Sequence, residues 1–273
     1  MQLELLSAQP SGQKKNVSIL FIHGVCLGAW CWEPHFLPFF AQAGYPAYAL
    51  SLRGHGRSDG HERIQHWQLR DFADDLAWAM HGIDGPVIVA GHSMGGGVVQ
   101  HYLRQGRKAA GVVLLASAPP HGLMRASVSM YQRNPTLWDE LYTSQGKPIS
   151  HIDLGIIENG LFSEPDLSPE RMDTLRRLGQ PAVRASLELM GWPPFAPLPW
   201  MAPPMMIVGG ERDELIPPAD VFLTGAYYGI NPKIIPGSAH AIMLDTHWRQ
   251  AAELITAWLE RKFGGAENER RCA

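Results

Sequence analysis

The chain has 273 residues, of which 45% are hydrophobic and 18% charged, and its formal net charge at pH 7 is −3. This length suits one domain with a sizeable insertion or two small domains, and the apolar share excludes a disordered chain. The mild charge argues against a nucleic-acid partner, since the one basic cluster, Arg270-Arg271, lies in a polar tail. The sequence carries no indication of an oligomeric state.

Cysteines and the N-terminal segment bear on the compartment. The 3 cysteines have no framework spacing, which favours free thiols in a reducing environment. Residues 1–15 lack a signal-peptide pattern, and Pro and Gly interrupt the apolar stretches before bilayer length. Cys26 and Cys31 lie near two histidines, but their spacing matches no usual zinc pattern. We therefore predict a cytoplasmic protein without stable membrane association, metal or cofactor.

Strand and helix patterns alternate along the first 119 residues. A weak alternation predicts an edge strand at 3–7, and continuous apolar runs predict buried strands at 17–22, 46–52, 87–90 and 111–116. Helical spacing predicts helices at 32–43, 71–81 and 97–104. This alternation predicts an α/β fold, a mostly parallel sheet with helices on both faces. Ligands of such sheets gather at the carboxyl ends of the strands.

The pattern changes between residues 120 and 203. Strand signals vanish, and short helices are predicted at 127–134, 136–144, 151–158, 168–178 and 182–190. Ser168 followed by Pro169 is a favourable helix start, with Ser as the N-cap. We expect residues 120–203 to form a helical cap over the carboxyl edge of the sheet. The core would then consist of residues 1–119 and 204–273.

The last part of the chain resumes the sheet. Strands are predicted at 205–209 and 233–235, followed by acidic residues and by Ser238-Ala239-His240 respectively. Asp245-Thr246 is expected to cap a closing helix in which Trp248, Ala252, Ile255 and Leu259 share one face.

A Gly-x-Ser-x-Gly set, Gly91-His92-Ser93-Met94-Gly95, follows the buried strand at 87–90. Flanking glycines let the chain reverse sharply, which leaves the Ser93 hydroxyl at the tip of a strand-to-helix turn. The backbone N–H of Met94 and the positive end of the next helix would then face a developing negative charge.

A serine hydroxyl is a poor nucleophile unless an imidazole accepts its proton and a carboxylate orients that imidazole. Ser93, Asp213 and His240 follow three different strands, so a parallel sheet brings their loops to one edge. Glu211 and Glu214 compete with Asp213 for the carboxylate role. Cys26 has no such turn to present it as a nucleophile.

The chain resembles the α/β-hydrolase family, in its capped branch of esterases, lipases and relatives. The resemblance rests on five motifs in the expected order: His23-Gly24, Arg53-Gly54-His55-Gly56-Arg57-Ser58, Gly91-His92-Ser93-Met94-Gly95-Gly96, Gly209 to Asp213, and Ser238-Ala239-His240. It implies Ser93 as nucleophile, Asp213 as acid and His240 as base. It also implies an oxyanion hole formed by the backbone N–H groups of Val25 and Met94. His23, His55 and His92 are expected to be structural.

The motifs and the cap suggest an apolar substrate pocket. Its expected residues are Leu27, Trp30, Met124, Met190, Trp192 and Met243, although these side chains could equally well belong to the core and cap.

We predict a serine hydrolase that cleaves carboxylic esters of apolar acyl or alcohol groups, with a small-molecule ester as its partner. Alternatives on the same triad are a thioesterase, a carbon–carbon bond hydrolase or a hydroxynitrile-lyase-like enzyme. A non-catalytic ligand-binding receptor is the alternative from another class of protein.

Overall fold

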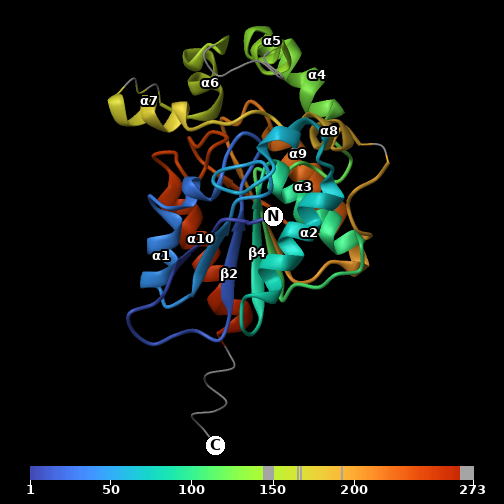
Figure 1. The fold of residues 1–273 in the computed structure, drawn as a ribbon. Helices are drawn as coiled ribbons and strands as arrows, with labels where there is room; N and C mark the ends of the chain where they lie inside the picture. Colours follow the sequence, from blue (N-terminus) through green and yellow to red (C-terminus); the bar gives the residue numbers. More distant parts are fainter. Residues whose placement is uncertain (144–150, 165, 167, 192, 265–273) are drawn as a thin grey trace, which may run out of the picture.

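The computed structural model describes residues 1–143, 151–164, 166, 168–191 and 193–264. Its centre is a seven-stranded sheet in the order β1-β3-β2-β4-β5-β6-β7 (Figure 1). β1 pairs antiparallel with β3, and the other neighbouring pairs are parallel. The strands are β1 (Leu5–Ala8), β2 (Ser18–Ile22), β3 (Ala47–Leu50), β4 (Val87–His92), β5 (Gly111–Leu115), β6 (Met205–Gly210) and β7 (Lys233–Ile235). The predicted fold class is confirmed.

Helices cover both faces of this sheet (Figure 1). Leu20 and Ile22 of β2 belong to the apolar layer beneath one set of helices, whereas Ile19 and Phe21 belong to the other layer. The first set is α2 (Leu69–His81), α3 (Met94–Arg104) and α9 (Pro218–Tyr228), and the second is α1 (Phe36–Gln42) and α10 (Trp248–Phe263). Because both faces are covered, the central strands are buried and their sequences are continuous apolar runs.

Between β5 and β6 the chain leaves the sheet and forms helices above its carboxyl end (Figure 1). They are α4 (Met124–Arg133), α5 (Pro135–Thr143), α6 (Leu154–Leu161), α7 (Pro169–Arg176) and α8 (Val183–Glu188). We call residues 120–203 the cap. A small apolar cluster that includes Leu137, Ile157 and Leu175 holds it together. The Ser168 side chain accepts a hydrogen bond from Arg171 N, as predicted for the start of α7. The domain boundaries themselves stay a prediction.

The two ends of the cap cross at a pair of glycines. Gly122 has φ +88° and Gly191 has φ +121°, a backbone region that L side chains rarely adopt. A Cβ on Gly122 would lie 2.6 Å from the backbone nitrogen of Gly191, so the crossing leaves no space for a side chain there. Next to it, Leu123 N donates a hydrogen bond to Leu189 O at 2.9 Å.

The structure corrects the predicted elements at three places. The helix predicted at 32–43 begins at Phe36, because residues 29–32 first form a 3₁₀ turn. Helix α9 was not predicted. Asp245 does not cap α10: the N-cap is His247, without a side-chain cap bond. The expected apolar face of α10 is present, since Ala252, Ile255 and Leu259 are buried. The segments His61–His66 and Pro199–Met201 are also 3₁₀-helical.

No helix in the described part of the chain combines the length and the apolar run that a bilayer crossing requires.

Candidate active site

The turn between β4 and α3 presents Ser93 under backbone strain. Ser93 has φ 51° and ψ −118°, a conformation that non-glycine residues rarely adopt. A Cβ on Gly91 would lie 2.6 Å from Gly95 O, so glycine is required at that step. Ser93 N donates to Leu115 O at 3.1 Å, which fixes the turn to the neighbouring strand. This is the sharp strand-to-helix turn that the Gly-x-Ser-x-Gly spacing predicts.

A buried pair, His240 and Asp213, lies on the loops after β7 and β6. His240 Nδ1 is 2.9 Å from Asp213 Oδ2 and 3.0 Å from Oδ1. Asp213 Oδ1 also accepts hydrogen bonds from Leu215 N at 2.9 Å and Ile216 N at 2.8 Å. A carboxylate so held accepts the Nδ1 proton and leaves the Nε2 lone pair of His240 free for a further proton.

The competing acidic residues lie elsewhere. Glu211 is exposed, and its Oε2 accepts a hydrogen bond from Gly237 N at 2.8 Å. Glu214 makes no hydrogen bond to His240 among the residues that the structure describes. Of the three candidates, Asp213 is therefore the one that the fold joins to His240.

Hydrogen bonds hold the backbone of His240 and of the preceding residue, Ala239. His92 Nε2 donates to His240 O at 2.9 Å, which ties the residue before Ser93 to the loop of the base. Asp245, 1% exposed, accepts a hydrogen bond from Ala239 N at 2.8 Å. The sequence does not reveal this role of Asp245, because a carboxylate shortly before a helix has the same pattern as an N-cap.

Ser93 and His240 line one apolar cavity of about 260 Å³ beneath the cap. Within the described residues, no hydrogen bond joins the Ser93 hydroxyl to His240. Catalytic hydrogen bonds are often long before substrate binds and tighten afterwards. The relevant observation is that Ser93 and His240 line the same cavity. The base loop is also joined to the cap, because Ala241 N donates to Leu161 O at 2.8 Å.

The two proposed oxyanion donors lie on the loop after β2 and at the start of α3. Val25 lines the cavity beside Ser93. Met94 is the first residue of α3, where backbone N–H groups have no partner within the helix. Their role as donors stays a prediction.

The predicted substrate residues divide into three groups. Leu27, Trp30 and Met190 line the cavity. Met124 and Met243 do not belong to its lining: Met124 is 57% exposed on α4, and Met243 is 1% exposed in the core beneath α10. Trp192 lies outside the described residues.

The sequence analysis missed most of the lining that the cap contributes. These apolar residues include Ile157, Leu161, Phe162, Leu175 and Leu187. Their helical spacing was visible, but which face of each helix turns toward the sheet depends on tertiary packing.

Three further histidines are buried away from any carboxylate. Burial lowers the pKa of His55 to about 4 and that of His92 to about 3, and it also lowers the pKa of His23. His23 accepts from Leu52 N through Nε2 at 3.0 Å, and its Nδ1 contacts Gly24 O at 2.7 Å. These bonds agree with the structural role expected for His23.

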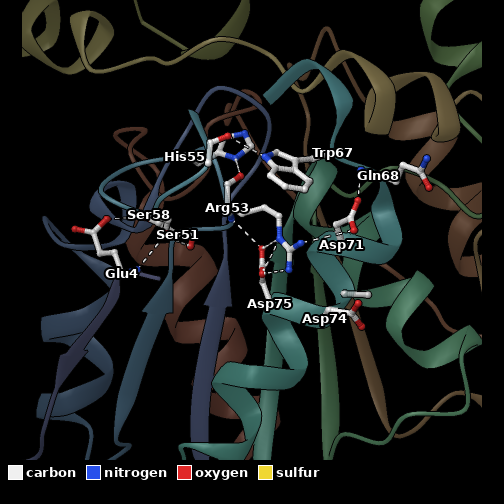
Figure 2. Close-up of polar contacts among 12 residues, drawn as sticks. Glu4, Ser51, Arg53, His55, Ser58, Trp67, Gln68, Asp71, Asp74 and Asp75 are labelled. Atoms are coloured by element: carbon white, nitrogen blue, oxygen red, sulfur yellow. Dashed lines mark hydrogen bonds and ion pairs between the residues drawn. The ribbon is translucent and has the colours of Figure 1, made fainter. Parts of the chain in front are cut away.

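The loop after β3 is built around Arg53 (Figure 2). Its guanidinium contacts both carboxylate oxygens of Asp75 on α2, with Nη2 2.6 Å from Oδ1 and Nε 3.1 Å from Oδ2. Trp67 lies against the same guanidinium, 5.1 Å from Cζ to the ring centroid. This motif supports the loop from below and contributes no side chain to the cavity.

The described residues contain no group of three or more His, Cys, Asp or Glu that could hold a metal ion. Desolvation raises the pKa of the Cys26 thiol to about 12, so that thiol is protonated at neutral pH and a poor nucleophile.

Comparisons with known proteins show the family to which the chain belongs. A monoacylglycerol lipase of Mycolicibacterium smegmatis is 27% identical over 240 residues, which cover 82% of this chain and 81% of that protein. A bifunctional esterase/perhydrolase of Acinetobacter calcoaceticus is 37% identical over 117 residues, 40% of each chain. A solved esterase from Exiguobacterium antarcticum shares the fold, with a TM-score of 0.75 at 16% identity over 94% of this chain and 95% of that one. The profile of the alpha/beta hydrolase family matches residues 19–254, and the chain therefore belongs to this family.

Proposed function

We propose that this protein is a serine hydrolase of carboxylic esters, with Ser93 as nucleophile, His240 as base and Asp213 as the orienting acid. One observation carries the proposal: the buried His240–Asp213 pair opens onto the same cavity as the strained Ser93. The relatives named as a lipase and an esterase support this class of reaction.

The geometry suits a two-step acyl transfer. The Ser93 oxygen attacks the ester carbonyl while its proton moves to Nε2 of His240, and Asp213 stabilises the imidazolium that forms. The N–H groups of Val25 and Met94 are the proposed donors to the oxyanion. The tetrahedral intermediate collapses as His240 returns the proton to the leaving alcohol. Water, activated by the same imidazole, then hydrolyses the acyl-serine.

The cavity favours apolar esters. Its lining is mostly aliphatic and aromatic, with Leu27 and Trp30 from the core and Leu187 and Met190 from the cap. A pocket of this kind binds through apolar contact and discriminates chain length by size. We propose that residues 120–203 act as the cap of this pocket. A cytoplasmic location and the absence of nucleic-acid and stable membrane partners stay predictions of the sequence.

The test is a series of p-nitrophenyl esters of graded acyl length, assayed with the intact protein and with Ser93→Ala. We expect turnover by the intact protein, a maximum at one chain length, and loss of activity in Ser93→Ala. A fluorophosphonate probe is expected to label Ser93 in the intact protein. Labelling without turnover of any ester would move the assignment to another reaction on the same triad. The absence of both labelling and turnover would contradict the proposal.

A further inference from the structure

The cap contributes a few hydroxyl side chains to the lining of the cavity, in walls that are otherwise mostly apolar. They are Ser127 on α4, Tyr142 on α5, Thr174 on α7 and Ser186 on α8. A hydroxyl in such surroundings needs an acceptor for its proton, because an unpaired buried polar group costs free energy. The acceptor of each proton therefore decides which of these side chains can bind a ligand.

Two of these hydroxyl protons are used within the chain. Ser186 Oγ donates to Ala182 O at 3.0 Å, and Thr174 Oγ1 donates to Glu170 O at 3.0 Å. Both acceptors are main-chain carbonyls four residues earlier, a common partner of serine and threonine in helices. Ser186 and Thr174 therefore have no proton left for a ligand in the cavity.

Ser127 is bonded differently, because it accepts two hydrogen bonds from α5. The donors are Trp138 Nε1 at 3.0 Å and the Tyr142 hydroxyl at 2.8 Å. The two rings stack with centroids 4.6 Å apart, so both donors are held on one face of α5. Among the described residues, no carbonyl accepts the proton of the Ser127 or the Tyr142 hydroxyl.

A count of protons shows that this group has one donor to spare. It holds one such hydrogen on the indole nitrogen and one on each hydroxyl, and the two contacts use two of these three. A phenol is a stronger donor and a weaker acceptor than an aliphatic hydroxyl, so Tyr142 donates and Ser127 accepts. The spare proton is therefore that of Ser127. The two bonds that Ser127 accepts polarise its hydroxyl and make it a better donor.

Ser127 lies in the wall of the cavity. It is 9% exposed and lines the cavity together with Tyr142, whereas Trp138 does not belong to the described lining. The described lining contains no lysine or arginine, so a carboxylate bound there would lack a counter-charge from such a side chain. The ligand atom that suits this donor is therefore a neutral oxygen acceptor, such as an ether or ketone oxygen.

We propose that Ser127 is a specificity-determining residue: its hydroxyl donates a hydrogen bond to a neutral ether or ketone oxygen in the apolar part of the ester substrate, away from the scissile bond. The inference rests on the proposed function, because it assumes that the cavity binds an ester. It narrows the expected substrates from purely hydrocarbon chains to chains that carry an oxygen. A hydrocarbon group at that place would leave the Ser127 proton without an acceptor, which weakens binding.

The experiment measures how each variant discriminates between an ester and its oxygen-containing analogue. Medium-chain alkyl alkanoates are compared with analogues in which an ether oxygen replaces one methylene of the acyl or alcohol chain, one position at a time. Acid release is followed by titration at constant pH. The measured quantity is kcat/KM of the ether analogue divided by kcat/KM of the hydrocarbon ester, which we call the ether ratio. The intrinsic reactivities of the two esters cancel when this ratio is compared between variants.

The comparison that isolates Ser127 is made without the Tyr142 hydroxyl, since removal of Ser127 alone would free the Tyr142 proton for a ligand. Tyr142→Phe keeps the Ser127 proton, and we expect its ether ratio to stay within about twofold of that of the intact protein. In the double variant, Ser127→Ala with Tyr142→Phe, we expect the ratio to fall about three- to tenfold at the best position of the oxygen.

Ser186→Ala is the matched control, because it removes a hydroxyl from the same lining whose proton is already used by Ala182 O. We expect its ether ratio to equal that of the intact protein. If the double variant does not fold, Ser127→Cys in the Tyr142→Phe background replaces it. The sulfur still accepts from Trp138, but a thiol is a weak donor, so the same fall is expected.

Three results would overturn the proposal. The first is an equal ether ratio in Tyr142→Phe and the double variant at every position of the oxygen, and the second is a fall in Ser186→Ala as large as that in the double variant. The third is the full loss in Tyr142→Phe alone, which would assign the donor to Tyr142. Turnover of hydrocarbon esters with equal ratios in all variants contradicts this inference alone, whereas no turnover of any ester contradicts the proposed function as well.

Discussion

Two buried ion pairs follow strands of the same sheet, and they differ in the cation. Arg53 and Asp75 meet beneath the loop after β3 (Figure 2), whereas His240 and Asp213 meet on the loops after β7 and β6. Arginine is charged at every accessible pH, so the Arg53–Asp75 pair is suited to stabilising the fold rather than to moving a proton. A neutral imidazole whose Nδ1 is held by a carboxylate can accept a proton at Nε2, so the second pair is suited to proton transfer. The partner of each carboxylate, Arg53 for Asp75 and His240 for Asp213, thus indicates whether it serves stability or proton transfer.

The largest effect is expected from a change in the His240–Asp213 pair. Asp213→Asn keeps the size of the side chain but replaces the carboxylate that accepts the Nδ1 proton, and the wrong histidine tautomer then faces Ser93. We expect kcat to fall by about 10⁴-fold, with little change in the thermal unfolding midpoint. Steady-state kinetics and a melting curve of the same preparation measure both. A loss below about tenfold would mean that another residue orients His240.

The Arg53–Asp75 pair is expected to affect stability instead. Asp75→Asn removes the carboxylate that contacts the Arg53 guanidinium through both oxygens and leaves the longer contact with Asp71 Oδ1 at 3.6 Å, and Asp75 is 1% exposed. We expect the free energy of unfolding to drop by about 3–5 kcal/mol, measured by urea denaturation. The matched control is Asp74→Asn on the same helix, whose partner is Arg107 and whose side chain is 55% exposed; there we expect about 0–1 kcal/mol. Similar losses in both variants would contradict the assignment of Arg53–Asp75 as the structural pair.

The histidines without a carboxylate predict acid sensitivity. Burial lowers the pKa of His55 from 6.5 to about 4 and that of His92 to about 3, so the folded protein leaves them neutral where the unfolded chain protonates them. The free energy of unfolding should therefore be fully present above pH 6.5 and fall as pH drops toward 4, by about 1.4 kcal/mol per pH unit for each histidine. His55→Gln is expected to reduce that slope by one histidine's share in urea titrations between pH 7 and 5. An unchanged slope would show that His55 is protonated in the folded state.

The smallest effect is expected from a change at Glu211, which tests the choice of Asp213 as the acid. Glu211 lies two residues before Asp213 but is exposed and bonded to Gly237 N at 2.8 Å. We expect Glu211→Gln to keep kcat within about twofold, since the hydrogen-bond acceptor survives and His240 is not its partner. A loss comparable to that of Asp213→Asn would reverse the assignment.

The strands and the three residues of the proposed triad could be identified in the sequence, because apolar runs and the Gly-x-Ser-x-Gly turn are local signals. Their meeting point follows from a general property of parallel sheets. What the pattern missed depends on tertiary packing. Met124 was expected in the pocket, but α4 begins at Met124 and that side chain turns outward. Helix α9 starts with proline at its first turn, a favourable helix start from which no helix was predicted.

The crossing of Gly122 and Gly191 bears on how this fold diversifies. Because the insertion leaves and re-enters at one point between the neighbouring strands β5 and β6, a change in its length does not separate these strands, as long as contacts such as that of Leu161 O with Ala241 N are kept. Exchange of that module between relatives would alter which molecules are admitted while the reacting groups stay in place. Selection for new specificity can thus act on a segment separate from the chemistry.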